Sequence, residues 1–193
     1  MSKVTAHLNC NLDLVNLAAA RTVHGQEVKA PLTFWMMTEH SPLRLINLYF
    51  QIDDLETFVS VHFVRHSKFS DHFVTSNRDD RGGSEAGSEN RFTLVNHGIA
   101  TNAQALISMS LKRLCYMSHP RTVAAMRKIR RATGKVLPEL EPYLVPECVR
   151  RRYCPEAKEC DVGLPAVLSA YTDFPPWVRH LKKYGPGWGV EEK

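Results

Sequence analysis

The stretch Val64–Arg81, VRHSKFSDHFVTSNRDDR, sets two polar motifs a short distance apart in the chain. Arg65 and His66 come first, at the end of an apolar run, and Ser76 and Arg78 follow. Each guanidinium offers a planar fork that binds two phosphate oxygens at once, and the serine hydroxyl adds a neutral donor. The imidazole adds a flat ring that can lie against a heterocycle. These groups together are typical of a site that holds a nucleotide.

Length and charge narrow the class of protein. A chain of 193 residues with 44% hydrophobic content can bury one sizeable core, so one domain is expected. The formal net charge of +5 and the pI of about 9.0 favour an anionic ligand, which leaves a nucleotide, a nucleic acid and an acidic protein surface open. Asn9, Asn11 and Asp13 interrupt the N-terminus, and no run of about twenty apolar residues occurs. We expect a soluble, cytoplasmic protein with no membrane partner.

The first two expected elements are a helix and a strand. Residues 12–21 carry apolar side chains at helical spacing and an alanine run, which predicts a helix ending near Thr22. Residues 45–52, LINLYFQI, alternate in polarity and are rich in β-prone side chains, so they predict a strand. The turn His40-Ser41-Pro42 separates the two elements.

Three further helices are expected from apolar spacing and capping signals. Asp53 and Asp54 are expected to cap a helix over residues 55–66, which brings Arg65 and His66 to its C-terminal end. The other two helices are expected over residues 100–113 and from Pro120, after the Ser118-His119 cap, to about Thr133.

The remaining segments are expected to be irregular. Residues 82–90, GGSEAGSEN, predict a polar surface loop after Arg78, so that only a short link separates Arg78 from the helix at 100–113. In the last part of the chain, frequent prolines allow only short helices and turns. We therefore expect a main unit over residues 1–135 and a C-terminal extension, residues 136–193, packed on the same domain.

The order of these elements resembles the flavin-dependent thymidylate synthases, the ThyX family, from about residue 15 to residue 130. The family's motif is Arg-His-Arg, seven residues, Ser, one residue and Arg. Here Arg65-His66-Ser67 is followed by eight residues and then Ser76-Asn77-Arg78. Three shorter matches accompany it: Ala19-Ala20-Arg21 on the first helix, His40-Ser41-Pro42 before the strand, and Asn102-Ala103 with Arg113 at the family's spacing.

The resemblance implies an α+β fold, in which a small antiparallel sheet packs with long helices, followed by a Pro-rich C-terminal segment. It implies transfer of a one-carbon unit from methylenetetrahydrofolate to C5 of a deoxyuridine monophosphate or related pyrimidine. FAD is the implied hydride carrier, NADPH its reductant, and no metal ion is implied. Sites in this family are shared between subunits, so the resemblance also implies a homotetramer.

Site residues are likewise implied by the resemblance. The implied FAD contacts are Arg65, His66, Asn102 and Ser108. The implied nucleotide contacts are Ser76, Arg78, Arg113 and His62, of which Ser76 and Arg113 are the catalytic candidates. A fixed cation such as Arg113 beside the pyrimidine carbonyl stabilises negative charge that develops on the ring, by a few kcal/mol.

Several positions depart from the family pattern. Ser67 stands in place of the motif's second Arg, and Ser108 and Gln104 replace residues that are commonly Asn and Arg. Arg44 and Leu45 occupy the turn where the family carries Glu followed by His. These departures leave open a different pyrimidine nucleotide, and transfer of a hydroxymethyl instead of a methyl group.

The site residues also have structural interpretations. At a helix C-terminus, Arg65 and His66 can complement the helix dipole, worth about 0.3–1 kcal/mol. Arg113 can be a surface arginine whose stem lies along an apolar helix. The spacing between the motifs favours the functional interpretation.

A non-enzymatic alternative stays open. It is a catalytically inactive ThyX-like protein that binds nucleotide or nucleic acid without flavin turnover. The basic runs at residues 127–131 and 150–152 are suited to a nucleic-acid backbone, although such runs are usually solvated faces.

The cysteines suggest a different kind of site. Without a secretory signal the five cysteines are expected to be reduced thiols. Cys148, Cys154 and Cys160 are evenly spaced, and Cys115 or His119 is available as a fourth ligand, so zinc binding is an alternative. The short Cys-x2–4-Cys clip that is usual in zinc sites is absent.

Overall fold

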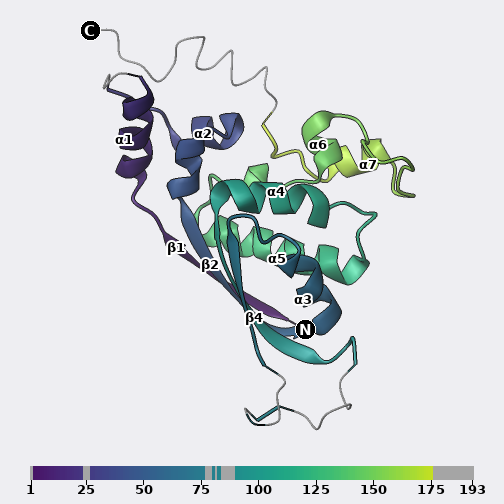
Figure 1. Cartoon of the computed structure of the whole chain (residues 1–193). Helices are drawn as coiled ribbons and strands as arrows, with labels where there is room; N and C mark the ends of the chain where they lie inside the picture. The colour runs from purple at the N-terminus through teal and green to yellow at the C-terminus, as the bar shows by residue number, and fades with distance from the viewer. Residues whose placement is uncertain (1, 24–26, 77–79, 81, 84–89, 176–193) are drawn as a thin grey trace.

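The computed structural model describes residues 2–23, 27–76, 80, 82–83 and 90–175. It is an α+β fold, as predicted (Figure 1). The elements in chain order are β1 (Lys3–Asn9), α1 (Leu12–Thr22), α2 (Leu32–Thr38), the 3₁₀ helix η1 (Ser41–Leu45), β2 (Asn47–Glu56), α3 (Thr57–Val64), β3 (Ser70–Val74), β4 (Leu94–Asn102), α4 (Ala103–Arg113), α5 (Pro120–Val136), the 3₁₀ helix η3 (Glu141–Tyr143), α6 (Glu147–Arg151) and α7 (Leu164–Ser169).

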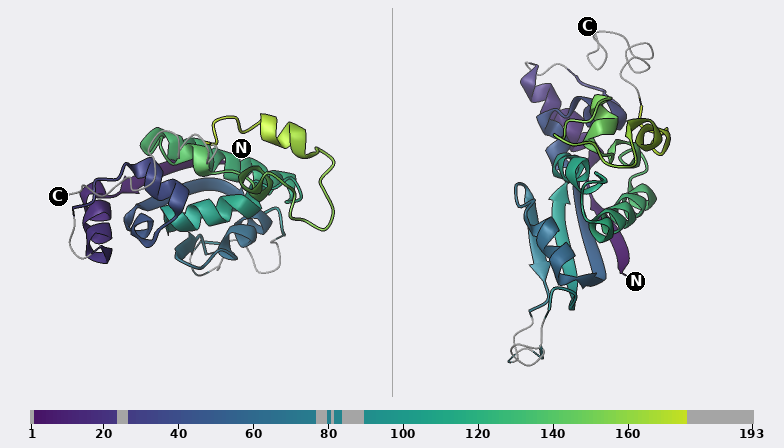
Figure 2. Two further views of the ribbon diagram at one scale, coloured as in Figure 1. Left: turned by 90° about the horizontal axis from the view of Figure 1, so that it is seen from above. Right: turned by 90° about the vertical axis from the view of Figure 1, so that its right-hand side faces the viewer.

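The strands form one antiparallel sheet in the order β1-β2-β4-β3. Side chains alternate between its faces, so that Phe50 and Ile99 are buried beneath the helices while Gln51 and Phe73 are exposed on the other side. On the covered face, α5 lies along β1, and α3 packs against β2 and β4. Figure 2 shows α4 and α5 lying side by side, an arrangement that encloses the core between helices and sheet.

One cluster of buried side chains joins the sheet, the helices and the C-terminal segment. Phe50 of β2, Phe63 of α3 and Met126 of α5 are fully buried in it. Burying each such side chain contributes about 1.5–3 kcal/mol. The same cluster contains residues from the C-terminal part of the chain, namely Leu144, Val149, Val167, Tyr171 and Phe174. Residues 136–175 therefore pack on the same core as the sheet.

Several helices begin and end where the sequence predicts. The first, α1, ends at Thr22, and α5 begins at Pro120. His119 caps α5, because its Nδ1 accepts a hydrogen bond from the Arg121 N–H at 3.3 Å. As predicted, residues 137–175 carry only short helices. Within the described ranges, the helices fall short of the length and apolar character that crossing a bilayer requires.

The prediction that Asp53 and Asp54 cap a helix over residues 55–66 is wrong. Strand β2 continues through both aspartates to Glu56, with a shift in its pairing register after Ile52. Asp54 takes a left-handed backbone conformation, with φ of 55°. Such a bulge lets polar residues stay in a strand while the strand bends. The helix α3 begins directly after the strand and still delivers the Arg-His pair at its C-terminal end.

The prediction of a helix over residues 100–113 is wrong in its first turn. Strand β4 runs to Asn102, and α4 begins at the next residue. The strand buries alternate side chains on the helix-covered face: Val95, His97, Ile99 and Thr101. Because β4 pairs with both β2 and β3, pairing overrides local helix propensity. The expectation of a mere short link between Arg78 and α4 is also wrong, since β4 fills much of it.

Candidate functional site

A cavity of about 380 Å³ opens where the end of α2, η1, α4 and the α3–β3 connection meet. Its lining includes three of the predicted cofactor residues, Arg65, His66 and Ser108. Its volume is in the range of small-molecule sites. Arg65 is joined there by two cations that the motif did not include, Arg44 and Lys68. The cavity therefore favours an anionic ligand.

Arg44 is held in place by two contacts. Its Nε donates a hydrogen bond to Gln104 Oε1 at 2.6 Å, and its guanidinium lies 4.9 Å from the centre of the Phe69 ring. Gln104 in turn donates from Nε2 to the Glu39 carbonyl at 3.0 Å. A guanidinium fixed in this way loses little side-chain freedom when it binds an anion. The sequence marked Arg44 and Gln104 only as departures, and their pairing gives both a role at the cavity.

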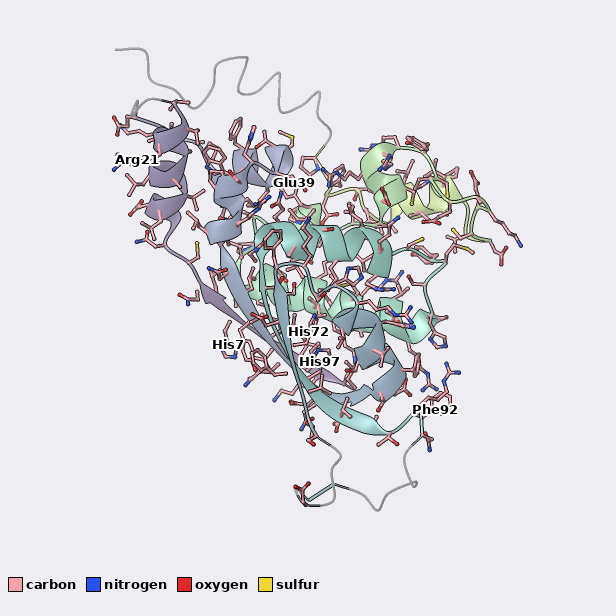
Figure 3. The ribbon with its side chains drawn as sticks, viewed as in Figure 1. His7, Arg21, Glu39, His72, Phe92 and His97 are labelled. Carbon is pink, nitrogen blue, oxygen red and sulfur yellow. The ribbon has the colours of Figure 1, made fainter. Side chains whose placement is uncertain are left out.

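Glu39 is the only carboxylate among the residues described as lining this cavity. Glu39, labelled in Figure 3, ends α2 in a left-handed conformation, with φ of 50°. It forms an ion pair with Arg150 of α6. Burial raises the pKa of Glu39, while the neighbouring Arg150 lowers it. Because Arg150 balances this carboxylate from outside the cavity, the charge of the lining cations is largely retained.

Phe69 places an aromatic ring at the cavity. Its backbone is left-handed, with φ of 61°, and its side chain is half exposed. Such a conformation costs a non-glycine residue about 1–3 kcal/mol, and strained residues of this kind cluster at functional sites. Lys68 Nζ lies 5.7 Å from the same ring that Arg44 covers. An exposed ring beside cations suits a ligand that combines a heterocycle with phosphate.

Arg113 is fixed behind the cavity by His66. The Arg113 Nε donates to His66 Nε2 at 2.8 Å, so this imidazole nitrogen is an acceptor and His66 is neutral. Burial, followed by Arg113 and His72, lowers the pKa of His66 to about 4. The motif histidine and the predicted catalytic arginine, which are far apart in sequence, therefore form one unit.

Three histidines form a chain of hydrogen bonds beneath this unit. His97 Nδ1 lies 3.0 Å from Ser60 Oγ, and His97 Nε2 lies 3.0 Å from His72 Nδ1. His72 Nε2 lies 3.4 Å from the His66 carbonyl oxygen. One set of tautomers satisfies all three contacts, with Ser60, His97 and His72 each donating to the next group. Figure 3 shows His72 and His97 next to each other beneath the helices. This chain of hydrogen bonds supports the backbone at His66, in the Arg-His motif.

Two other predicted nucleotide residues, His62 and Ser76, are not among the residues that line this cavity. His62 faces α5, where its Nδ1 lies 2.8 Å from Thr122 Oγ1. Burial, followed by Arg113 and Arg65, lowers the pKa of His62. Ser76 lies beyond the far end of β3, and at about 3.3 Å per residue the span from Ser70 is about 20 Å. Arg78 is outside the described residues.

Asn102, a predicted flavin contact, has a clear structural role. Its side-chain oxygen accepts a hydrogen bond from the Ala105 N–H at 3.0 Å and thereby caps α4. We expect Asn102→Ala to lower the free energy of unfolding by about 1 kcal/mol, and Asn102→Ser, which keeps a capping oxygen, to retain most of it. Urea denaturation measures both. Equal losses in the two variants would contradict the capping role.

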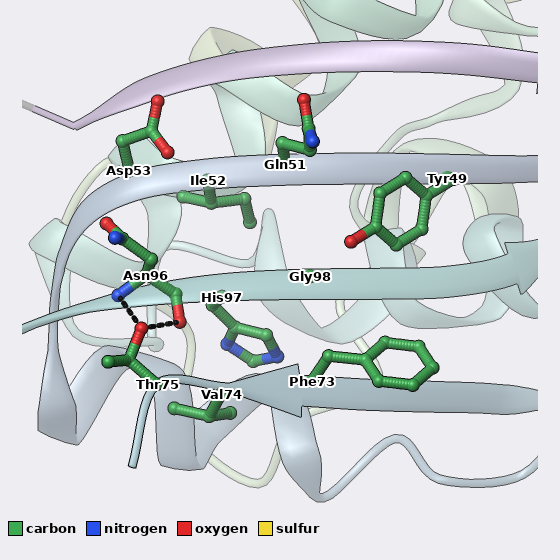
Figure 4. Close-up of a pocket in the computed structure, with 10 residues that line it drawn as sticks. All are labelled: Tyr49, Gln51, Ile52, Asp53, Phe73, Val74, Thr75, Asn96, His97 and Gly98. Carbon is green, nitrogen blue, oxygen red and sulfur yellow. Dashed lines mark hydrogen bonds between the residues drawn. The ribbon is translucent and has the colours of Figure 1, made fainter. Parts of the chain in front are cut away.

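A second cavity, of about 320 Å³, lies on the exposed face of the sheet (Figure 4). Tyr49, Gln51 and Phe73 line it, and a Cβ at Gly98 would lie 2.5 Å from the Tyr49 hydroxyl. Asp53 is the charged residue of its lining, and no lysine or arginine is among the residues described there. The first cavity, with its three cations, is therefore the better candidate for an anionic ligand.

Comparisons with known proteins bear on the fold. No protein-family model and no curated protein matches the sequence. Among solved structures, the UMP/dUMP methylase PolB from Streptomyces cacaoi, bound with 5-Br dUMP, matches with a TM-score of 0.56 and 15% identity, over 74% of this chain and 94% of that one. ThyX from Helicobacter pylori, with FAD and dUMP, matches with a TM-score of 0.56 and 13% identity, over 77% of this chain and 99% of that one. The chain has a ThyX-like fold.

Proposed function

We propose that this chain is a ThyX-like transferase. It moves a one-carbon unit from methylenetetrahydrofolate to C5 of a deoxyuridine monophosphate or related pyrimidine, with FAD as hydride carrier and NADPH as reductant. The observation that carries the proposal is the contact between His66, which lines the cationic cavity, and Arg113, because it joins the family motif to a second, separate family match on a ThyX-like fold. The two structural neighbours were solved with dUMP or its 5-bromo derivative.

The residues of the cavity fit a flavin dinucleotide by their chemistry. Arg44, Arg65 and Lys68 offer donors to phosphate oxygens, and Phe69 offers a ring for stacking. FAD, when bound, supplies the hydride for the reduction of the one-carbon unit. Arg113, fixed on His66, stabilises negative charge on the pyrimidine ring.

We further propose that the nucleotide site is shared between subunits of a homotetramer. Within one chain, Ser76 lies about 20 Å along β3 from Ser70, which adjoins the cavity. Ser76 and Arg78 would therefore bind the nucleotide phosphate at a neighbouring subunit's cavity. The arrangement gives both halves of the motif a role without a change in the fold of the chain.

The basic runs at residues 127–131 and 150–152 give little support to the alternative of nucleic-acid binding. Several of their arginines make contacts within the chain: Arg127 with Tyr116, Arg130 with Glu141 and Asp173, Arg150 with Glu39, and Arg151 with Glu147. These contacts reduce the positive charge available to a phosphate backbone. We therefore favour the transferase over a nucleic-acid-binding protein.

The proposal is tested by flavin binding and its reduction. The purified chain is expected to bind FAD with a shifted absorbance spectrum that bleaches on addition of NADPH and dUMP. Arg65→Ala should weaken FAD binding roughly 10- to 100-fold, the loss expected for a charge-assisted hydrogen bond. Arg131→Ala, at an exposed position of α5, is the matched control and should bind as the wild type does. A chain that binds dUMP but no FAD would contradict the transferase and support the inactive nucleotide-binding alternative.

A further inference from the structure

Four of the five cysteines come together from separate parts of the chain. Cys115 follows α4, Cys148 lies in α6, and Cys154 and Cys160 lie between α6 and α7. All four line one small cavity of about 20 Å³, and each is a partly buried free thiol. A cavity of this size has room for one water-sized occupant. Cys10, in contrast, follows β1 and is not part of the group.

The loop that carries two of these cysteines has few other anchors. Residues 152–163 contain no helix or strand, and their side chains are exposed apart from Cys154, Cys160 and the glycine at 163. The loop's Glu156 Oε1 lies 3.7 Å from Lys112 Nζ, an exposed contact that stabilises little. Ordering such a segment costs conformational entropy that two half-buried thiols cannot offset by hydrophobic burial. A bond from both thiols to a common ion would anchor the loop more firmly.

The charged groups around the cavity balance one another. Lys112 lies on α4 close to Cys115 and pairs with Glu147 at 2.6 Å. Arg151 pairs with the same glutamate at 2.7 Å. The two cations and the carboxylates of Glu147 and Glu156, both of which line the cavity, therefore leave little net charge beside the thiols.

We propose that Cys115, Cys148, Cys154 and Cys160 bind one Zn²⁺ through their four sulfurs in a tetrahedral structural site. Four thiolates leave no open position, so the ion fixes residues 152–163 to α4 and α6 and takes no part in catalysis. Soft sulfur ligands in a tetrahedral set favour zinc over magnesium or calcium. Among the described residues, no three His, Cys, Asp or Glu side chains are placed so that they could hold a metal ion. Binding therefore draws the thiols together through side-chain rotation and a shift of the loop.

The site is tested by the metal content of the full chain purified from zinc-supplemented medium. Mass spectrometry of the elements is expected to find one zinc per chain in the wild type and in Cys10→Ser, the matched control. Cys154→Ser and Cys160→Ser should lose the zinc. Exchange of zinc for Co²⁺ should give the visible absorption of tetrahedral cobalt and the near-ultraviolet charge-transfer bands of cobalt thiolates in the first two proteins only.

A second measurement on the wild type guards against variants that fail to fold. Stripping the metal with a mercurial reagent and a chelator, then restoring thiols with excess dithiol, should make residues 152–163 open to protease, and added Zn²⁺ should restore protection. Zinc that persists in Cys154→Ser and Cys160→Ser would overturn the site, as would a chain that carries neither zinc nor a cobalt-thiolate band. Iron with its visible sulfur charge-transfer absorption would replace zinc with an iron–sulfur centre and overturn the assignment. The outcome is independent of flavin binding, so either proposal can fail alone.

Discussion

Arg113→Lys is expected to lower kcat/KM for one-carbon transfer to the pyrimidine nucleotide by about 10²–10³-fold, or about 2.7–4 kcal/mol of transition-state stabilisation. The arginine is half-buried, and its Nε donates to His66 Nε2 at 2.8 Å. A lysine keeps the positive charge but has no planar fork, so it cannot hold His66 and face the pyrimidine carbonyl at the same time. Steady-state rates of the methylated product, at several nucleotide concentrations, measure the loss.

The matched control for this variant is Arg131→Lys, at an exposed position of α5 away from the cavity. We expect it to keep the wild-type kcat/KM, because an exposed arginine outside the site contributes nothing to the transition state. Circular dichroism and urea denaturation should show both variants folded. A wild-type kcat/KM in Arg113→Lys would remove the arginine from the catalytic machinery, while its loss together with that of folding would assign the residue a structural role.

The helices were more predictable from the sequence than the strands. Capping signals and apolar spacing located α1 and α5, because these depend on residues that are close in sequence. Strands β1, β3 and β4 were missed. β1 and β3 are edge strands with mostly exposed side chains. The apolar residues Val4, Ala6 and Leu8 do alternate along β1, but pairing with β2 and β4 creates both edge strands.

The candidate site was predicted in part. The motif spacing pointed to Arg65, His66 and Arg113, two of which the structure joins by a hydrogen bond. Arg44 and Gln104 could not be found in this way, since they lie 60 residues apart and acquire their contact only when η1 meets α4. A motif can be recognised in the local sequence, whereas the other residues that line a cavity are brought together only by tertiary packing.

The four-cysteine cluster shows the same limit. Sequence spacing gave three evenly spaced cysteines and two candidates for a fourth, Cys115 and His119. In the fold, Cys115 lines the cavity with the other three. His119 instead caps α5 and packs its ring 4.7 Å from that of Phe58. The choice between the two residues therefore required the packing of α6 against α4.

The free energy of unfolding is expected to fall by about 3 kcal/mol between pH 6.5 and pH 4 because of His97. This imidazole is 1% exposed, and burial, followed by His72, lowers its pKa from 6.5 to about 4. The unfolded chain takes up a proton below pH 6.5, while the folded chain does so only near pH 4. The stability is therefore complete above pH 6.5 and is lost as the pH falls toward 4. His66 shifts in the same direction and adds a smaller effect, because it is more exposed.

Urea unfolding across this pH range, in the wild type and in His97→Gln, isolates the effect. The glutamine is uncharged at every pH, so the variant should be less stable than the wild type near neutral pH but show a flatter decline on acidification. His7→Gln, at an exposed position of β1, is the matched control and should keep the wild-type slope. Carboxylates titrate alike in all three proteins, and the difference between the curves therefore belongs to the histidine. Parallel curves for the wild type and His97→Gln would mean that the buried hydrogen-bond chain tolerates a charged His97, and that another group governs acid stability.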